Sequence, residues 1–300
     1  MNMNKLVSAL IPTYGGGQYL QRTVDSVLAQ TYPHIEVIVI DDNGVGTENQ
    51  KKTQAVMDAY KDESRVMYLC HEVNRNGSAA RNTGFAHSKG DYICLLDDDD
   101  EYTPEKLERQ VTGLEQHPEC GLTYCSREMY VNGKRTSVNR ALPSDDFFYD
   151  LVTHRRGISS GTLMVRREVW LQLNGFDESF RRHQDYEFTA RVASAFPILP
   201  LDFIGLKKYM LGRNMAAVPR KVFEIRKQYM ATVEPLMSHF NTDQRRKVIE
   251  ANYLALAMKA FFKGDLKTWR VIYQYAKPGL WGYTYMLKYA MKSIKSKLIH

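Results

Sequence analysis

The sequence has no long hydrophobic run. Of its 300 residues 44% are hydrophobic, yet no stretch approaches the roughly 18 uninterrupted apolar residues of a membrane-spanning helix. The first five residues also lack the apolar run of a secretory signal peptide. We therefore expect a protein that stays in the cytoplasm, and its length suffices for one α/β domain with a smaller appendage.

Cysteine is scarce and has no metal-binding pattern. The four cysteines form no CxxC pair, and Cys94 lies within an apolar run typical of a buried strand. His117 lies close in sequence to Cys120 and Cys125, but a fourth ligand at zinc spacing is missing. We expect reduced thiols in the core rather than a zinc site.

Acidic residues are missing from the last part of the chain. Residues 267–300 contain seven Lys or Arg and no Asp or Glu, whereas the first 266 residues are neutral by the same count. Within 280–298, apolar residues recur at helical spacing with lysines along one flank, which predicts an amphipathic basic helix. Such a helix suits an anionic membrane surface, although docking on the protein's own first domain explains the apolar stripe equally well. The neutral body, which has no RNA- or DNA-reading motif, argues against nucleic acid as a partner.

Short β-branched apolar runs alternate with helical patterns in the first half. The runs predict strands at 6–11, 37–40, 66–69, 92–96 and 121–124, with helices near 18–30, 49–61, 78–88 and 104–116. Strands that are apolar on both faces and separated by helices predict a mostly parallel central sheet flanked by helices. The first half therefore indicates an open α/β fold.

The second half predicts a change of architecture. A long loop is expected at 126–160, a strand at 162–165 and a helix at 185–196. After Pro219 the pattern is wholly helical, with breaks at two Gly-containing turns. We therefore predict a first domain at 1–215 and an α-helical C-terminal extension at 216–300 with a basic amphipathic end.

Acidic residues cluster at the ends of two predicted strands. Asp41 and Asp42 follow one strand, and the four aspartates at 97–100 follow another. In open α/β sheets this edge binds ligands, and adjacent carboxylates repel one another unless a cation or hydrogen-bond donors compensate them. Because residues two apart in extended backbone point the same way, Asp97 and Asp99 can share Mg²⁺ or Mn²⁺. The alternative is a solvated acidic turn before the next helix.

Two further segments contain residues suited to a nucleotide. Tyr14 follows the first strand and is well placed to stack on a base, whereas the glycines at 15–17 lack the GxGxxG spacing of a dinucleotide site. Arg81 lies among small residues that open a helix. Its guanidinium suits either a phosphate contact or a structural ion pair with a clustered aspartate.

Six motifs in this order resemble the family-2 inverting glycosyltransferases with the GT-A fold. They lie at 11–14, 26–33, 39–42, 80–82, 96–100 and 175–180, the last followed by Gln184-Asp185. The resemblance covers roughly residues 5–215. It implies that residues 1–215 form a GT-A catalytic domain that uses a nucleotide-sugar donor, with a UDP-sugar expected first.

The resemblance also implies which residues hold the donor. Pro12, Thr13 and Tyr14 look like the segment that holds the nucleobase. Asp42 looks like the acid that accepts a hydrogen bond from the uracil ring, and Arg81 resembles the donor-site arginine.

The metal and the catalytic base follow from the same resemblance. Asp97, Asp98 and Asp99 look like the DXD motif, whose carboxylates contact the donor ribose and hold the metal on the diphosphate. Asp97 and Asp99 are the implied ligands of Mn²⁺ or Mg²⁺. Asp185 is similar to the catalytic base of the ED signature, with Gln184 in place of the usual Glu. Without the resemblance, a helix N-cap would be the favoured role for Asp185.

The implied activity is metal-dependent transfer of a sugar to an acceptor hydroxyl on a glycan or a lipid-linked acceptor. By family analogy the setting is cell-surface polysaccharide assembly on the inner face of the cytoplasmic membrane, with peripheral attachment through 267–300. A nucleotidyltransferase of related α/β fold is one alternative, but it would need a basic triphosphate loop, and residues 8–17 contain no Lys or Arg. A non-catalytic scaffold that binds nucleotide-sugars is the other, and it would be expected to lack Asp185 or part of the 97–100 cluster.

Overall fold

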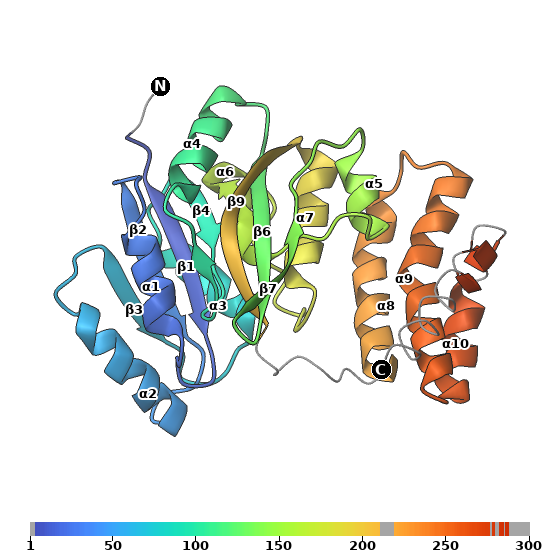
Figure 1. Ribbon diagram of the computed structural model, residues 1–300, viewed down its shortest axis with the longest axis horizontal. Helices are drawn as coiled ribbons and strands as arrows, with labels where there is room; N and C mark the ends of the chain where they lie inside the picture. Colours follow the sequence, from blue (N-terminus) through green and yellow to red (C-terminus); the bar gives the residue numbers. More distant parts are fainter. Residues whose placement is uncertain (1–3, 211–218, 277, 280–281, 285, 288–300) are drawn as a thin grey trace. The chain divides into compact units, whose positions relative to one another are not determined.

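The chain divides into two units, each of which is described by itself (Figure 1). The computed structural model describes residues 4–210, 219–276, 278–279, 282–284 and 286–287. The first unit contains Met1–Asp145 and Ile158–Gly212, and the second contains Asp146–Gly157 and Arg213–His300. A short internal segment thus belongs to the helical unit. The predicted boundary at 215 lies outside the described residues.

The first unit is built on one sheet in the order β3-β2-β1-β4-β8-β6-β9-β5, with β7 paired to β6. Strands β3, β2, β1 and β4 are parallel to one another, as the alternating pattern predicted. Strand β8 is antiparallel to both β4 and β6, and β6 is parallel to β9. The strands are β1 (Val7–Thr13), β2 (Ile35–Asp41), β3 (Val66–Cys70), β4 (Tyr92–Leu95), β5 (Glu101–Tyr102), β6 (Leu122–Val131), β7 (Lys134–Asn139), β8 (Leu163–Arg166) and β9 (Ile198–Met210).

Helices connect these strands, and polar caps define where several of them begin. Thr47 accepts a hydrogen bond from the Gln50 amide at the start of α2, and Asn76 accepts from the first amides of α3. Such caps satisfy amides that have no partner inside the helix. The helices of this unit are α1 (Leu20–Leu28), α2 (Glu48–Met57), α3 (Gly77–His87), α4 (Lys106–Gln116), α6 (Arg167–Gln172) and α7 (Gln184–Ala195), with 3₁₀ turns η1 (Asp58–Tyr60) and η2 (Ser160–Thr162).

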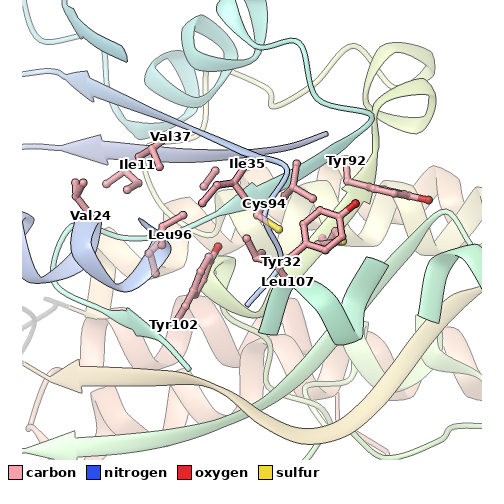
Figure 2. Packing of buried hydrophobic residues seen from close by; sticks show 14 of the residues in the cluster. Ile11, Val24, Tyr32, Ile35, Val37, Tyr92, Cys94, Leu96, Tyr102 and Leu107 are labelled. Carbon is pink, nitrogen blue, oxygen red and sulfur yellow. The ribbon is translucent and has the colours of Figure 1, made fainter. Parts of the chain in front are cut away.

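The core lies against the parallel strands. Residues 37–40 of β2 are fully buried, which explains why the sequence shows a continuous apolar run there rather than an alternation. Figure 2 shows Ile11, Val37 and Leu96 in this core with Tyr102. On α3, a Cβ added at Gly84 would lie 2.6 Å from Ile40 Cδ1. A larger residue at this position would therefore displace the Ile40 side chain from its place between α3 and β2.

The second unit is helical. It contains α5 (Phe147–Val152), α8 (Pro219–Leu236), α9 (Thr242–Phe262) and α10 (Leu266–Ala276). Asn241 and Gln244 form a reciprocal capping box at the start of α9. The Asn252 side chain of α9 donates to Val152 O, 2.8 Å away, and so joins the internal segment to the C-terminal helices. Most of the helix predicted at 280–298 lies outside the described residues.

Two sequence-based expectations are wrong. The loop predicted at 126–160 instead contains a hairpin of β6 and β7, turning at Asn132 and Gly133 with φ of 50° and 75°. An Asn-Gly pair adopts this turn readily, but all six β7 residues are exposed and give no buried pattern. Strand β9 was also missed, because Pro200 and register shifts opposite 125–127 interrupt its alternation.

None of the helices in the described parts of the chain combines the length and the apolar character that crossing a membrane requires.

Candidate active site

The carboxyl ends of the parallel strands bring the predicted site residues to one edge of the sheet. Thr13 at the end of β1 pairs in register with Asp41 at the end of β2, and β4 runs parallel beside β1 into the aspartates at 97–100. Helix α3 provides Arg81 at this edge. The edge is where an open α/β sheet places its ligand.

Asp97 is the centre of a hydrogen-bonded network. Its Oδ1 accepts from Arg81 Nη2 and from Ser160 Oγ, both 2.9 Å away, and its Oδ2 lies 3.2 Å from Lys208 Nζ. Burial alone would raise the pKa of Asp97, but the charges of Lys208 and Arg81 outweigh it and lower that pKa to about 2. Asp97 is therefore a carboxylate with two positive neighbours.

Asp100 shares one of those cations. Lys208 Nζ donates to Asp100 Oδ2 at 2.8 Å, and the Tyr209 amide donates to Oδ1 at 2.9 Å. The Asp100 side chain is fully buried, and this burial raises its pKa against the opposing charge of Lys208. Asp97 and Asp100 together raise the pKa of Lys208 above its usual value although burial acts to lower it. Lys208 is thus positively charged at neutral pH.

Asp98 holds the end of β1. Its Oδ2 accepts from Thr13 Oγ1 at 2.6 Å and from the Tyr14 amide at 3.3 Å. Burial raises the pKa of Asp98 to about 6, and the neighbouring charges of Asp99 and Asp97 act in the same direction. Tyr14 is 62% exposed, which leaves its side chain open to contact with a planar ligand.

Arg81 links the carboxylate edge to helix α7. Only 7% of this residue is exposed, and its Nη1 donates to Gln184 Oε1 at 2.7 Å and to Gly77 O at 3.1 Å. Its Nη2 forms an ion pair with Asp97. A structural ion pair was one of the two interpretations of Arg81, and it is present. The acceptor on α7 is therefore a neutral amide rather than a carboxylate.

Asp185 lies in the first turn of α7, next to this network. The N-cap residue of α7 is His183, with φ of 61°, so the capping role considered for Asp185 is wrong. Its half-buried carboxyl accepts from the Tyr186 amide at 3.0 Å. Burial raises the pKa of Asp185, the charge of Asp97 raises it further, and Arg81 lowers it. A carboxylate with a raised pKa is a better proton acceptor than an ordinary aspartate.

Asp42 has partners from its own chain on both carboxylate oxygens. Oδ1 accepts from His71 Nδ1 and the Arg75 amide, both at 2.7 Å. Oδ2 accepts from the Asn74 side chain at 2.8 Å and the Asn76 amide at 2.9 Å. The carboxylate is 4% exposed and fixes the loop that leads into α3. Its expected contact with a uracil ring stays a prediction.

The residues expected to hold a divalent cation already have partners from the chain itself. Asp97 already accepts hydrogen bonds from three side chains, while the half-buried Asp99 accepts one from Arg22 at its main-chain oxygen, 2.7 Å from Nη2. Across the described ranges, no three His, Cys, Asp or Glu side chains gather as a metal-binding group. As arranged, Lys208 and Arg81 balance the charge of Asp97, and the role of Asp97 and Asp99 as metal ligands stays a prediction.

Sequence reasoning missed three residues of this site. Lys208 lies in a strand that was not predicted and Ser160 in the predicted loop at 126–160, so nothing linked them to the aspartates 60 or more positions earlier. Arg127 of β6 is 9% exposed, and burial lowers its pKa although nearby Tyr186 and Asp185 act in the opposite direction. A buried cation close to Asp185 had no local signal in the sequence.

Comparisons with known proteins identify the family and the fold. Residues 8–172 match the model of the family "Glycosyl transferase family 2". Glycosyltransferase GlyG of Streptococcus pneumoniae is 36% identical over 74% of this chain and 76% of that protein. The amylovoran biosynthesis glycosyltransferase AmsB of Erwinia amylovora is 27% identical over 70% of this chain and 68% of that protein.

The first curated relatives are longer proteins from Rickettsia. The uncharacterized glycosyltransferase of Rickettsia bellii is 33% identical over 64% of this chain, and the match spans only 28% of that protein. Among solved structures, S. aureus TarS 1–349 in complex with UDP-GlcNAc superimposes with a TM-score of 0.60 at 15% identity, covering 90% of both chains. A likeness at that identity establishes the fold.

Proposed function

The chain belongs to glycosyl transferase family 2. We propose that it transfers a sugar from a nucleotide-sugar donor to an acceptor hydroxyl, and that the donor is a UDP-sugar. The observation that carries the proposal is the position of Asp185. Its carboxyl has a raised pKa and lies beside the Arg81–Asp97 ion pair at the sheet edge. A proton acceptor and a site for the donor diphosphate are the two components that glycosyl transfer needs.

In the proposed reaction Asp185 takes the proton of the acceptor hydroxyl as its oxygen attacks the anomeric carbon. The bond from that carbon to the donor diphosphate breaks, and the nucleoside diphosphate leaves with the electron pair. A single displacement inverts the anomeric configuration. Thr13 and Tyr14, fixed by Asp98, would face the nucleobase, and Arg81 would face the diphosphate.

A divalent cation remains part of the proposal. Mn²⁺ or Mg²⁺ on Asp97 and Asp99 would neutralise the charge that grows on the leaving diphosphate. Since Lys208 already contacts Asp97, such an ion has to share that carboxylate with a resident positive charge.

The acceptor is proposed to be a glycan or a lipid-linked sugar in cell-surface polysaccharide assembly. The similarity to AmsB, an amylovoran biosynthesis glycosyltransferase, supports this setting. A nucleotidyltransferase and a non-catalytic nucleotide-sugar-binding scaffold are the two competing functions.

A nucleotide-sugar panel is expected to separate the three functions. The melting temperature of the full chain is measured with UDP-, GDP- and dTDP-sugars and with nucleoside triphosphates, each with and without Mn²⁺. Ligand at about 100 times its Kd stabilises by about 2.7 kcal/mol, so we expect a clear rise with a UDP-sugar. Stabilisation by triphosphates alone would indicate nucleotidyl transfer. Donor binding without release of nucleoside diphosphate, in the presence of a range of acceptors, would indicate a scaffold.

We also propose that the second unit meets an anionic membrane surface. A cavity of about 510 Å³ in this unit is lined by aromatic and aliphatic side chains, of which Phe261, Tyr283 and Leu287 are 46%, 50% and 65% exposed. The seven Lys or Arg and no acid in 267–300 add the charge that anionic headgroups attract.

Vesicle sedimentation tests this partner. The full chain is expected to sediment with vesicles containing phosphatidylserine and to stay in solution with pure phosphatidylcholine. Substituting both Phe261→Ser and Leu287→Ser should reduce sedimentation, whereas Leu171→Ser, a 58% exposed leucine of the first unit, should not. Equal binding to both vesicle types, or no effect of the double variant, would contradict the proposal.

A further inference from the structure

Lys208 occupies the position between two carboxylates of the 97–100 cluster. Its Nζ lies 2.8 Å from Asp100 Oδ2 and 3.2 Å from Asp97 Oδ2. Its side chain is only 22% exposed, and the carboxyl of Asp100 is fully buried. The ammonium therefore bridges two anions in a largely dehydrated environment.

The strand register fixes this position. Strand β5, which directly follows the cluster, pairs with β9 so that Glu101 is opposite Lys207 and Tyr102 opposite Leu206. The Tyr209 amide also donates to Asp100. Because neighbouring residues of a strand point to opposite faces, Lys208 and Lys207 are directed differently, and Lys207 Nζ reaches Glu101 at 3.5 Å instead. Main-chain pairing, rather than side-chain flexibility, thus places Lys208 at the cluster.

The cluster is compensated by groups of the chain itself. Lys208 and Arg81 contribute two positive charges to Asp97, and Ser160 donates to the same carboxylate. Four adjacent carboxylates need such compensation, and removing one partner of a buried pair leaves a charge without its counter-ion. A divalent cation on Asp97 would meet Lys208 as a like charge at the same oxygen.

We propose that Lys208 is a resident counter-cation that stabilises the carboxylate cluster in the absence of metal and competes with divalent cations for Asp97. The inference takes one assumption from the proposed function, namely that residues 97–100 form part of the donor site. When Lys208 leaves Asp97, its contact with Asp100 is retained, so the competition concerns one carboxylate oxygen. The protein consequently folds with this carboxylate cluster already compensated before any metal arrives, and Lys208 lowers the affinity of the cluster for metal.

The test measures Mn²⁺ binding to the full chain without donor or acceptor. Free Mn²⁺ is followed by its solution electron paramagnetic resonance signal, and melting temperature is measured in parallel. Lys208→Met should bind Mn²⁺ about tenfold tighter or more than the wild type, because a competing charge has gone from a partly buried site. It should also melt lower without metal and recover on Mn²⁺ addition. Lys207→Met, the matched control on the next residue of β9, should behave like the wild type in both measurements.

Lys208→Gln provides a second variant if the methionine variant does not fold. Its amide can still donate to Asp97 or Asp100 but carries no charge, so tighter Mn²⁺ binding is expected again. Unchanged or weaker Mn²⁺ binding on loss of the Lys208 charge, or equal tightening in Lys207→Met, would overturn the proposal. The Mn²⁺ measurement needs no sugar transfer. Failure of every transfer assay would therefore refute the proposed function, whereas the role of Lys208 is decided by the Mn²⁺ measurement alone.

Discussion

Asp185→Asn is expected to abolish sugar transfer while nucleotide-sugar binding stays close to that of the wild type. The amide retains the shape of the side chain but cannot take a proton from the acceptor hydroxyl. General bases contribute about 10²- to 10⁴-fold to rates, so kcat should fall by at least about 10²-fold. The measurement pairs steady-state release of nucleoside diphosphate with calorimetric titration of the donor.

Asp177→Asn is the matched control for this variant. Asp177 is an exposed aspartate just before the same helix, where it accepts from the Ser179 amide, an interaction that asparagine retains. We expect wild-type kcat and donor affinity for it. Full activity of Asp185→Asn would remove Asp185 from the mechanism. Loss of donor binding together with activity would instead assign it to the donor site.

Asp42→Ala is expected to lower stability strongly. The change would remove the acceptor of four hydrogen bonds, two of them from main-chain amides, in a site that is 4% exposed. Each buried polar group left without a partner costs about 1–3 kcal/mol, and part of this is recovered by relaxation, so we expect a loss of roughly 3–6 kcal/mol. In a unit of this size, that corresponds to a fall in melting temperature of at least about 6 °C.

The control for Asp42→Ala is Asp58→Ala, which removes an exposed aspartate whose side chain accepts only a surface hydrogen bond from Gln54. Its melting temperature should be nearly unchanged. The two interpretations of Asp42 predict different results. A variant that keeps its melting temperature but loses UDP-sugar binding would contradict the loop-fixing role and favour the base contact implied by the family resemblance.

The sequence predicted those strands whose apolar pattern in the sequence matches their burial in the folded protein. Strands β1, β2 and β4 are buried on both faces, so their continuous apolar runs are visible without knowledge of the partner strands. The acids that follow β2 and β4 are adjacent to those runs in sequence. Their placement at one edge follows from parallel pairing alone.

The parts that were missed depend on distant pairing. Strand β9 has an interrupted alternation because it bends where its register with β6 shifts, and Lys208 acquires its role only through that pairing. The four donors around Asp42 come from a loop about 30 positions later, held in shape by the carboxylate itself. In both cases the missing information is which strand or loop becomes a neighbour.

Gln184 has a consequence for the net charge of the site. Because position 184 is an amide, the guanidinium of Arg81 faces one anion, Asp97, where a glutamate would have added a second. The edge therefore carries one negative charge fewer at neutral pH, and Coulomb repulsion against an incoming diphosphate is correspondingly weaker. An amide at position 184 thus makes this edge electrostatically more receptive to polyanions than a carboxylate there would.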